Sequence, residues 1–144
     1  MSRKKGERLI AENRLFQDLP ENVRHIVEAY IVAAKKQSIL TRGWVFGSYA
    51  WGEPRKGSDV DLYLVVERRP ESPEYSEHVA VAIARQADID GFGRYDVDLI
   101  VSYEDEFERY LEDDDSWEFR MVRDGVTLEK VIGGEDANGR EVME

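Results

Sequence analysis

The chain has 144 residues, of which 42% are hydrophobic and 35% charged, and it contains no cysteine. This composition is typical of one globular domain, and it excludes a disulfide framework, a thiolate zinc site and an apolar run long enough to span a bilayer. The formal net charge of −11 argues against a long nucleic acid as partner, because phosphate backbones are bound through many Lys and Arg contacts. A single nucleotide is compatible with this charge, since metal ions bridge acidic side chains to phosphate.

The first strongly patterned segment is a predicted helix over residues 20–36. Pro20 suits a first helical turn, where its missing N–H costs nothing. Apolar residues then recur at helical spacing and describe one buried face: Val23, Ile26, Val27, Tyr30, Ile31 and Ala34. Ahead of this helix, residues 9–17 are expected to form a short helix or an arm. No apolar signal-peptide core follows the basic N-terminal residues, so we expect a cytoplasmic protein.

Three strands are predicted in the middle of the chain. The first covers residues 44–46, and the second covers residues 59–66, whose near-continuous apolar run indicates burial on both faces. A helix over residues 75–87 precedes the third strand, residues 95–102. This helix supplies the crossover that a parallel pair of strands needs, although a mixed sheet fits the pattern equally well.

The last third of the chain is expected to be mainly helical. Residues 104–123 have helical composition with a break around residues 113–116, and Phe107, Leu111 and Phe119 are expected among the buried side chains. Gly125 suits the helix stop, and residues 126–132 are expected to form a final extended segment. The order of elements predicts a single α+β domain over residues 1–132, built on a small mixed sheet flanked by helices. Residues 133–144 are polar and are expected to form a flexible C-terminal tail.

The strand that ends at Gly47-Ser48 is the first feature with chemical content. Glycine allows close approach of a ligand, and backbone N–H groups and the Ser48 hydroxyl can point at a phosphate if a short helix begins at Tyr49. Asp59 and Asp61 are two residues apart, so on a strand their side chains leave from one face. Paired carboxylates repel each other unless a cation or proton lies between them, and oxygen ligands of this kind suit Mg²⁺ or Mn²⁺.

The third strand repeats this arrangement of carboxylates. Asp96 and Asp98 alternate onto one face, and an apolar run follows Asp98. Two carboxylate-bearing strands side by side would present three or four oxygen ligands over a small area, enough for two metal ions about 4 Å apart. Phosphoryl and nucleotidyl transfer need little covalent help from the protein, so metals and positioning can supply most of the catalysis.

The spacing of these residues resembles a known family signature. Gly47-Ser48, ten intervening residues and Asp59-Val60-Asp61 match the GS-x10-DxD pattern of the DNA polymerase beta-like nucleotidyltransferase superfamily. The resemblance covers roughly residues 20–128. The short chain looks like the minimal nucleotidyltransferase (MNT) branch, whose members are often antitoxins paired with HEPN-domain toxins.

The resemblance implies a role for each candidate site residue. The nucleotide would be held by three small residues: Gly47, Ser48 and Ser58. Asp59 and Asp61 would bind the metal ions. An acidic residue on the third strand would complete the metal site and help to deprotonate the acceptor hydroxyl; Asp98 is the first choice and Asp96 the second.

The implied enzyme uses Mg²⁺, with two ions, to move AMP from ATP to a hydroxyl, most simply a tyrosine of a partner HEPN toxin. Two alternatives stay open: transfer to a small molecule of the aminoglycoside type, and a catalytically silent antitoxin that acts by binding. The hypothesis of a silent antitoxin is motivated by Tyr49 and Trp51, because many relatives carry arginines at those two positions. Arg42, Arg55 and Lys56 are near enough in sequence to be candidates for replacing them.

The remaining aromatic and histidine residues carry weaker signals. Trp44, Trp51 and Trp117 each have the chemistry to stack on a base, but aromatic residues more often fill a core or an interface. We expect Trp44 in the core. His25 and His78 lie on predicted helices without metal-ligand spacing, so we expect them to be solvated or to cap helices.

Overall fold

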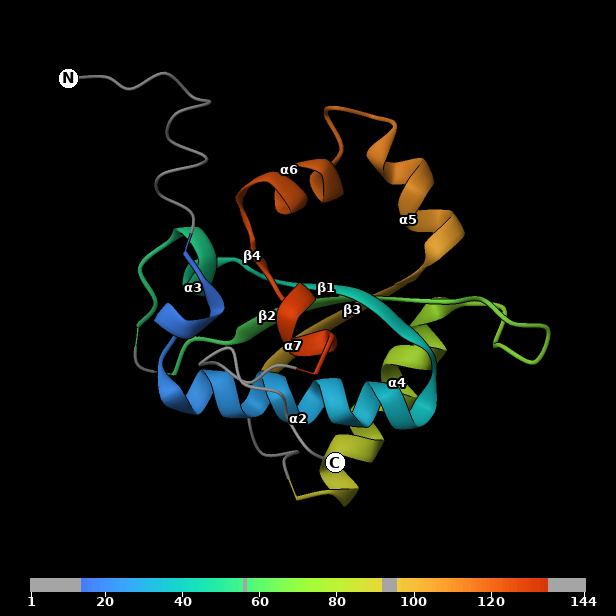
Figure 1. The fold of residues 1–144 in the computed structure, drawn as a ribbon, viewed down its shortest axis with the longest axis horizontal. Helices are drawn as coiled ribbons and strands as arrows, with labels where there is room; N and C mark the ends of the chain where they lie inside the picture. Colours follow the sequence, from blue (N-terminus) through green and yellow to red (C-terminus); the bar gives the residue numbers. More distant parts are fainter. Residues whose placement is uncertain (1–13, 56, 92–95, 135–144) are drawn as a thin grey trace.

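The computed structural model describes residues 14–55, 57–91 and 96–134, and the elements below are drawn in Figure 1. They follow in the order η1 (a 3-10 turn, Phe16–Asp18), α2 (Glu21–Gln37), β1 (Leu40–Phe46), α3 (Ser48–Trp51), β2 (Val60–Val66), α4 (Ser76–Ile89), β3 (Val97–Tyr103), α5 (Glu104–Leu111), α6 (Trp117–Asp124), β4 (Val126–Thr127) and α7 (Glu129–Ile132). Within the described residues, no helix combines the length and apolarity that crossing a membrane requires.

The strands form one mixed sheet in the order β3-β2-β1-β4. β2 and β3 are parallel, as the crossover helix α4 between them predicts, whereas β1 is antiparallel to both of its neighbours. The predicted α+β fold, a small mixed sheet flanked by helices, is therefore confirmed.

Helices cover both faces of the sheet, with α2 and α4 on one side and α5 and α6 on the other (Figure 1). The alternation of side chains along β2 divides its apolar run between these two layers. Leu62 and Leu64 pack in the larger core with α2 and α4, while Tyr63 and Val65 pack with Phe107 in the smaller core beneath α5 and α6. Burial on both faces explains why this strand has a nearly continuous apolar sequence.

The predicted extended segment over residues 126–132 is wrong beyond its first two residues. β4 contains only Val126 and Thr127, and α7 is a single helical turn. Leu128 and Val131 are buried in the larger core, and the Leu128 N–H donates to the Gly43 carbonyl at 2.9 Å. One turn of helix is too short to show a helical period in sequence, and here tertiary packing determines the structure.

The break in the C-terminal helical region is confirmed, because α5 ends at Leu111 and α6 begins at Trp117. Phe107 is fully buried as expected, but Leu111 and Phe119 are only partly buried, and Met121 fills the core position instead. Gly125 follows α6 with an ordinary negative φ. A Cβ there would lie 2.6 Å from the Met121 carbonyl oxygen, so close packing explains this glycine.

Two predicted terminal segments extend beyond the described residues. Of the predicted N-terminal helix or arm, residues 9–13 lie outside them, and the described part contains the short turn η1. Of the predicted tail, residues 135–144 lie outside them as well.

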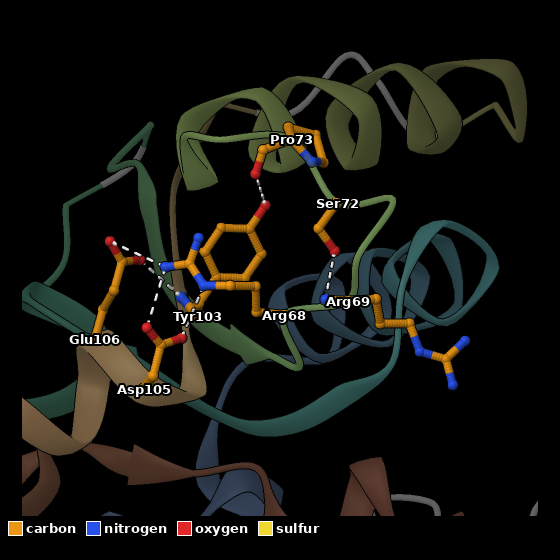
Figure 2. A network of polar contacts seen from close by, with 7 residues as sticks. All are labelled: Arg68, Arg69, Ser72, Pro73, Tyr103, Asp105 and Glu106. Carbon is orange, nitrogen blue, oxygen red and sulfur yellow. Dashed lines mark hydrogen bonds and ion pairs between the residues drawn. The ribbon is translucent and has the colours of Figure 1, made fainter.

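The loop between β2 and α4 is held against the start of α5 by a polar network (Figure 2). The Arg68 guanidinium lies 4.1 Å from the centroid of the Tyr103 ring and donates to both carboxylate oxygens of Asp105, at 3.1 and 3.2 Å. The Tyr103 hydroxyl donates to the Pro73 carbonyl at 2.5 Å. Because Tyr103 ends β3, these contacts fix the loop to the far end of the parallel strand pair, away from the ends that carry Asp61 and Asp98.

We expect Ser116→Ala to lower the free energy of unfolding by about 1 kcal/mol. Ser116 is the N-cap of α6, and its Oγ accepts a hydrogen bond from the Phe119 N–H at 3.0 Å. Urea denaturation of Ser116→Ala beside Ser116→Asp would measure the effect, because aspartate preserves the cap. An equal loss of stability in both variants would contradict this role.

Candidate active site

A glycine-initiated turn connects β1 to α3 at one end of the sheet. Gly47 has φ 73° and ψ −149°, a conformation that is essentially restricted to glycine. Its carbonyl accepts from the N–H groups of Ala50 and Trp51, at 2.9 and 3.0 Å, so the short helix begins at Ser48, one residue before the predicted start. The first N–H groups of a helix have no intrahelical acceptor and favour an anion.

The carboxylate of Asp61 lies directly against this turn. A Cβ on Gly47 would be 2.0 Å from Asp61 Oδ2, far inside contact distance. The approach follows from strand register, because Phe46 is paired with Asp61 across β1 and β2. Gly47 is therefore required both for its backbone conformation and for the space that the carboxylate occupies, and the two halves of the sequence motif are in contact.

Asp98 lies beside Asp61 on the same face of the sheet. The two residues are paired in register in the parallel β2–β3 ladder, and paired residues of adjacent strands point the same way. Asp96 precedes β3, its side chain is exposed, and its carbonyl accepts from the Val60 N–H at 2.9 Å. Of these two carboxylates, Asp98 is thus the one nearer to Asp61.

Two predicted strand starts are corrected at this end of the sheet. β2 begins at Val60 and not at Asp59, which stands exposed in the preceding loop. β3 begins at Val97, and Tyr95 lies outside the described residues. Both strands begin where ladder pairing begins, since Val60 and Val97 are the first paired residues.

Partial burial and the neighbouring carboxylates raise the pKa of Asp61 above its ordinary value. Partial burial is the largest cause, followed by the negative charges of Asp98 and Asp59. Among the described side chains, no three His, Cys, Asp or Glu groups are arranged to hold a metal ion by themselves. Mg²⁺ is usually bound through one or two carboxylates together with substrate phosphates and water, so the adjacent Asp61 and Asp98 fit such an ion by the chemistry of their donors.

Ser58 has a structural role in the loop that leads to the carboxylates. Its Oγ accepts from the Arg55 N–H at 2.7 Å, and its own N–H donates to the Arg55 carbonyl at 2.9 Å. These two bonds close a tight turn just before Asp59. Ser48, which like Ser58 is partly buried, lies at the start of α3 beside the Gly47 turn.

The basic residues considered as phosphate contacts differ in their position relative to the Gly47 turn. Arg42 pairs with Glu104 at 3.3 Å and with Glu108, near the opposite end of β1 from Gly47, so it does not reach the turn. Arg55 is exposed in the loop before β2, and Lys56 lies outside the described residues. Arg14 donates to the carbonyls of Ser48 and Tyr49, at 3.2 and 3.0 Å.

Arg14 was not singled out by the sequence. It places a positive charge behind the turn, but it lies 34 residues before Ser48 in the chain. Such a long-range contact has no sequence motif of its own, so no local pattern marks Arg14 as part of this region.

The tryptophans and histidines differ in their exposure to solvent. Trp44 is buried and stacks on Phe107, which confirms its expected place in the core. Trp51 on α3 and Trp117 on α6 are both exposed, and the Trp117 ring also packs against Phe46. His25 and His78 are both exposed, in agreement with the expectation that they are solvated.

At one end of the mixed sheet, a glycine turn thus lies against one strand aspartate, and a second aspartate lies in register beside it. The model of the polymerase beta nucleotidyltransferase family matches residues 30–128, a range that includes the turn and the candidate carboxylates. The chain belongs to this family.

The fold is also found in a solved structure. The crystal structure of a nucleotidyltransferase candidate from Sulfolobus solfataricus matches with a TM-score of 0.51 and 20% sequence identity. The match covers 100% of this chain and 99% of that one, so the shared fold extends over both proteins. No curated protein matches this sequence.

Proposed function

We propose that this protein is a Mg²⁺-dependent nucleotidyltransferase that moves AMP from ATP to a hydroxyl group. The observation that carries the proposal is the contact between the Gly47 turn, which leads into the N-terminus of α3, and the Asp61 carboxylate. Asp98 lies in register beside Asp61. Two Mg²⁺ ions would be held by Asp59, Asp61 and Asp98. Bound metal neutralises phosphate charge and polarises the phosphoryl oxygens.

The protein's own groups have separate tasks in the reaction. The N–H groups at the start of α3 and the Ser48 hydroxyl hold the phosphates. Asp98, whose side chain is exposed, accepts the proton of the attacking hydroxyl. The acceptor oxygen forms a bond to the α-phosphorus, the bond from that phosphorus to the oxygen bridging to the β-phosphate breaks, and pyrophosphate leaves with the electron pair.

For the acceptor, we propose a tyrosine of a partner HEPN toxin, which would make this chain an antitoxin of the MNT branch. Support comes from the family membership together with the net charge of −11, which favours a basic protein surface.

Labelled ATP distinguishes this reaction from other uses of ATP. The full chain would be incubated with Mg²⁺, the protein encoded beside it in the genome, and ATP labelled at either the α- or the γ-phosphate. We expect label on the partner from α-labelled ATP alone, and none with the Asp59→Ala/Asp61→Ala variant. Label from the γ-position, or equal transfer by the variant, would overturn the proposal.

A catalytically silent antitoxin is the second candidate, and a specific contact favours it. Arg42 is engaged with α5 carboxylates at the far end of β1, so it does not supply the charge that Tyr49 and Trp51 lack. Calorimetry separates the two functions: binding of a basic partner without Mg²⁺-dependent binding of ATP would favour the silent antitoxin.

A further inference from the structure

We propose that Trp117, the first residue of α6, is the platform on which the base of the bound nucleotide stacks. This inference rests on the proposed function, because it assigns a binding partner to the nucleoside part of the same substrate. It makes Trp117 a positioning residue for the donor nucleotide.

Trp117 lies over the two residues that adjoin Asp61 on the same face of the sheet. Its ring is nearly perpendicular to that of Phe46, with centroids 4.7 Å apart, and tilted against that of Tyr63, with centroids 5.7 Å apart. Phe46 pairs with Asp61 across the strands, and Tyr63 is one same-face step along β2, about 7 Å. A ribose separates base from phosphate by a similar length, so a nucleotide with phosphates at Gly47 and Asp61 would carry its base to Trp117.

The exposure of Trp117 distinguishes it from the buried rings of the smaller core. Trp44, Tyr63 and Phe107 are buried, whereas Trp117 is 41% exposed. On β3, the residue paired with Tyr63 is Ile100, which is 38% exposed. A single exposed aromatic residue is ordinary on a protein surface. Here the partly open ring packs on Tyr63, whose strand partner Ile100 is also exposed and which lies one same-face step from Asp61.

The position of the Trp117 ring is fixed before any ligand binds. The two ring contacts hold one part of the indole, and the Ser116 cap holds the turn of helix from which the side chain extends. Stacking on an immobilised ring loses little side-chain entropy, so more of the contact energy remains as affinity.

The charges around Trp117 favour a neutral aromatic ligand over an anion. Asp98 is exposed on the same face, and the Glu118 carboxylate accepts from the Tyr63 hydroxyl at 3.3 Å. These carboxylates repel a free phosphate group, whereas the face of a base carries no net charge. Because every base has a π-face, stacking on Trp117 would favour purines through their larger area and would tolerate all bases.

Calorimetry with two ligands separates binding of the base from binding of the phosphates. The full chain and its Trp117→Leu variant would be titrated with ATP and with inorganic triphosphate, each with Mg²⁺; leucine keeps an apolar contact with Phe46. We expect the variant to bind ATP about 5- to 150-fold more weakly and to bind triphosphate as the original chain does. Trp117→Phe should retain most of the ATP affinity.

A matched control removes an exposed aromatic ring elsewhere. Tyr75, before the first turn of α4, is 57% exposed and follows the loop at the opposite end of β2. Tyr75→Leu is expected to change the affinity for neither ligand. Circular dichroism of each variant would confirm that the secondary structure is retained.

The outcomes separate failure of this inference from failure of the proposed function. Equal ATP affinity in the original chain and in Trp117→Leu would overturn the stacking role alone. Parallel loss of ATP and triphosphate affinity would assign Trp117 to holding the sheet, which also overturns stacking. If the original chain binds neither ligand with Mg²⁺, the proposed function fails and this inference fails with it.

Discussion

Replacing Asp61 with asparagine is expected to reduce nucleotidyl transfer by about a thousandfold or more while making the fold more stable near pH 7. The activity falls because metal ions contribute several kcal/mol to phosphoryl chemistry, and each 1.36 kcal/mol corresponds to a tenfold change in rate. Asparagine matches the shape of the side chain, so the contact of Asp61 with the Gly47 turn is preserved.

The gain in stability follows from the sign of the pKa shift. Burial and then the charges of Asp98 and Asp59 raise the folded-state pKa of Asp61 above its ordinary value of 3.8. Between these two pKa values the folded state binds more protons, so the contribution of Asp61 to stability falls as the pH rises through that window. The variant should therefore be more stable than the original chain at neutral pH, and the difference should disappear below about pH 4.

Urea denaturation at neutral and acidic pH measures this effect, and Asp105→Asn is a matched control of opposite sign. The hydrogen bonds from Arg68 lower the pKa of Asp105 (Figure 2). Its stabilising contribution is present above the ordinary pKa and is lost as the pH falls through the folded-state value. Asp105→Asn should lower stability at neutral pH without affecting transfer. A fall in neutral-pH stability in Asp61→Asn would contradict the raised pKa of Asp61.

Gly47→Ala is expected to remove activity nearly as completely and, unlike Asp61→Asn, to destabilise the fold. The backbone conformation of Gly47 would cost alanine about 1–3 kcal/mol. The new methyl group would also occupy the place of Asp61 Oδ2 and force that carboxylate out of position. Thermal unfolding and the transfer assay together would record both effects.

Gly91→Ala separates backbone strain from displacement of the carboxylate. Gly91 has φ 92°, and a Cβ there would meet nothing within 4 Å. We expect a similar loss of stability from strain but no loss of transfer.

In a double-mutant cycle, Asp61→Asn should reduce activity little further in the Gly47→Ala background, since both changes remove the same carboxylate. Fully additive losses would contradict the contact between the two residues.

The elements that the sequence predicted well are those with long, regular patterns. The apolar stripe of α2 and the buried run of β2 each carry a clear period, and their predicted limits differ from the observed ones by a single residue. β1 was predicted to begin at Trp44, but it begins at Leu40. Its first part contains Thr41 and Arg42, whose partners Glu104 and Glu108 are on α5, so the reason for that extension lies far away in sequence.

The sequence predicted which residues form the candidate site better than it predicted how they are arranged. Spacing alone placed Asp59 and Asp61 together, and a glycine-serine turn pointed to phosphate. The contact between Gly47 and Asp61 depends on the register of β1 with β2, and the proximity of Asp98 depends on that of β2 with β3. Register is a property of paired strands, so a single sequence leaves it undetermined.

The pairing of Asp61 with Asp98 also has a consequence for the folding of the chain. Val97, Leu99 and Val101 pack with the larger core, while Asp98 faces the other side of the sheet. If β3 docked on β2 one residue out of step, Asp98 would turn toward the apolar side chains of α2 and α4, and a carboxylate is costly to bury there. The Asp98 carboxylate, which we propose as the proton acceptor, therefore also disfavours a mispaired intermediate while the sheet assembles.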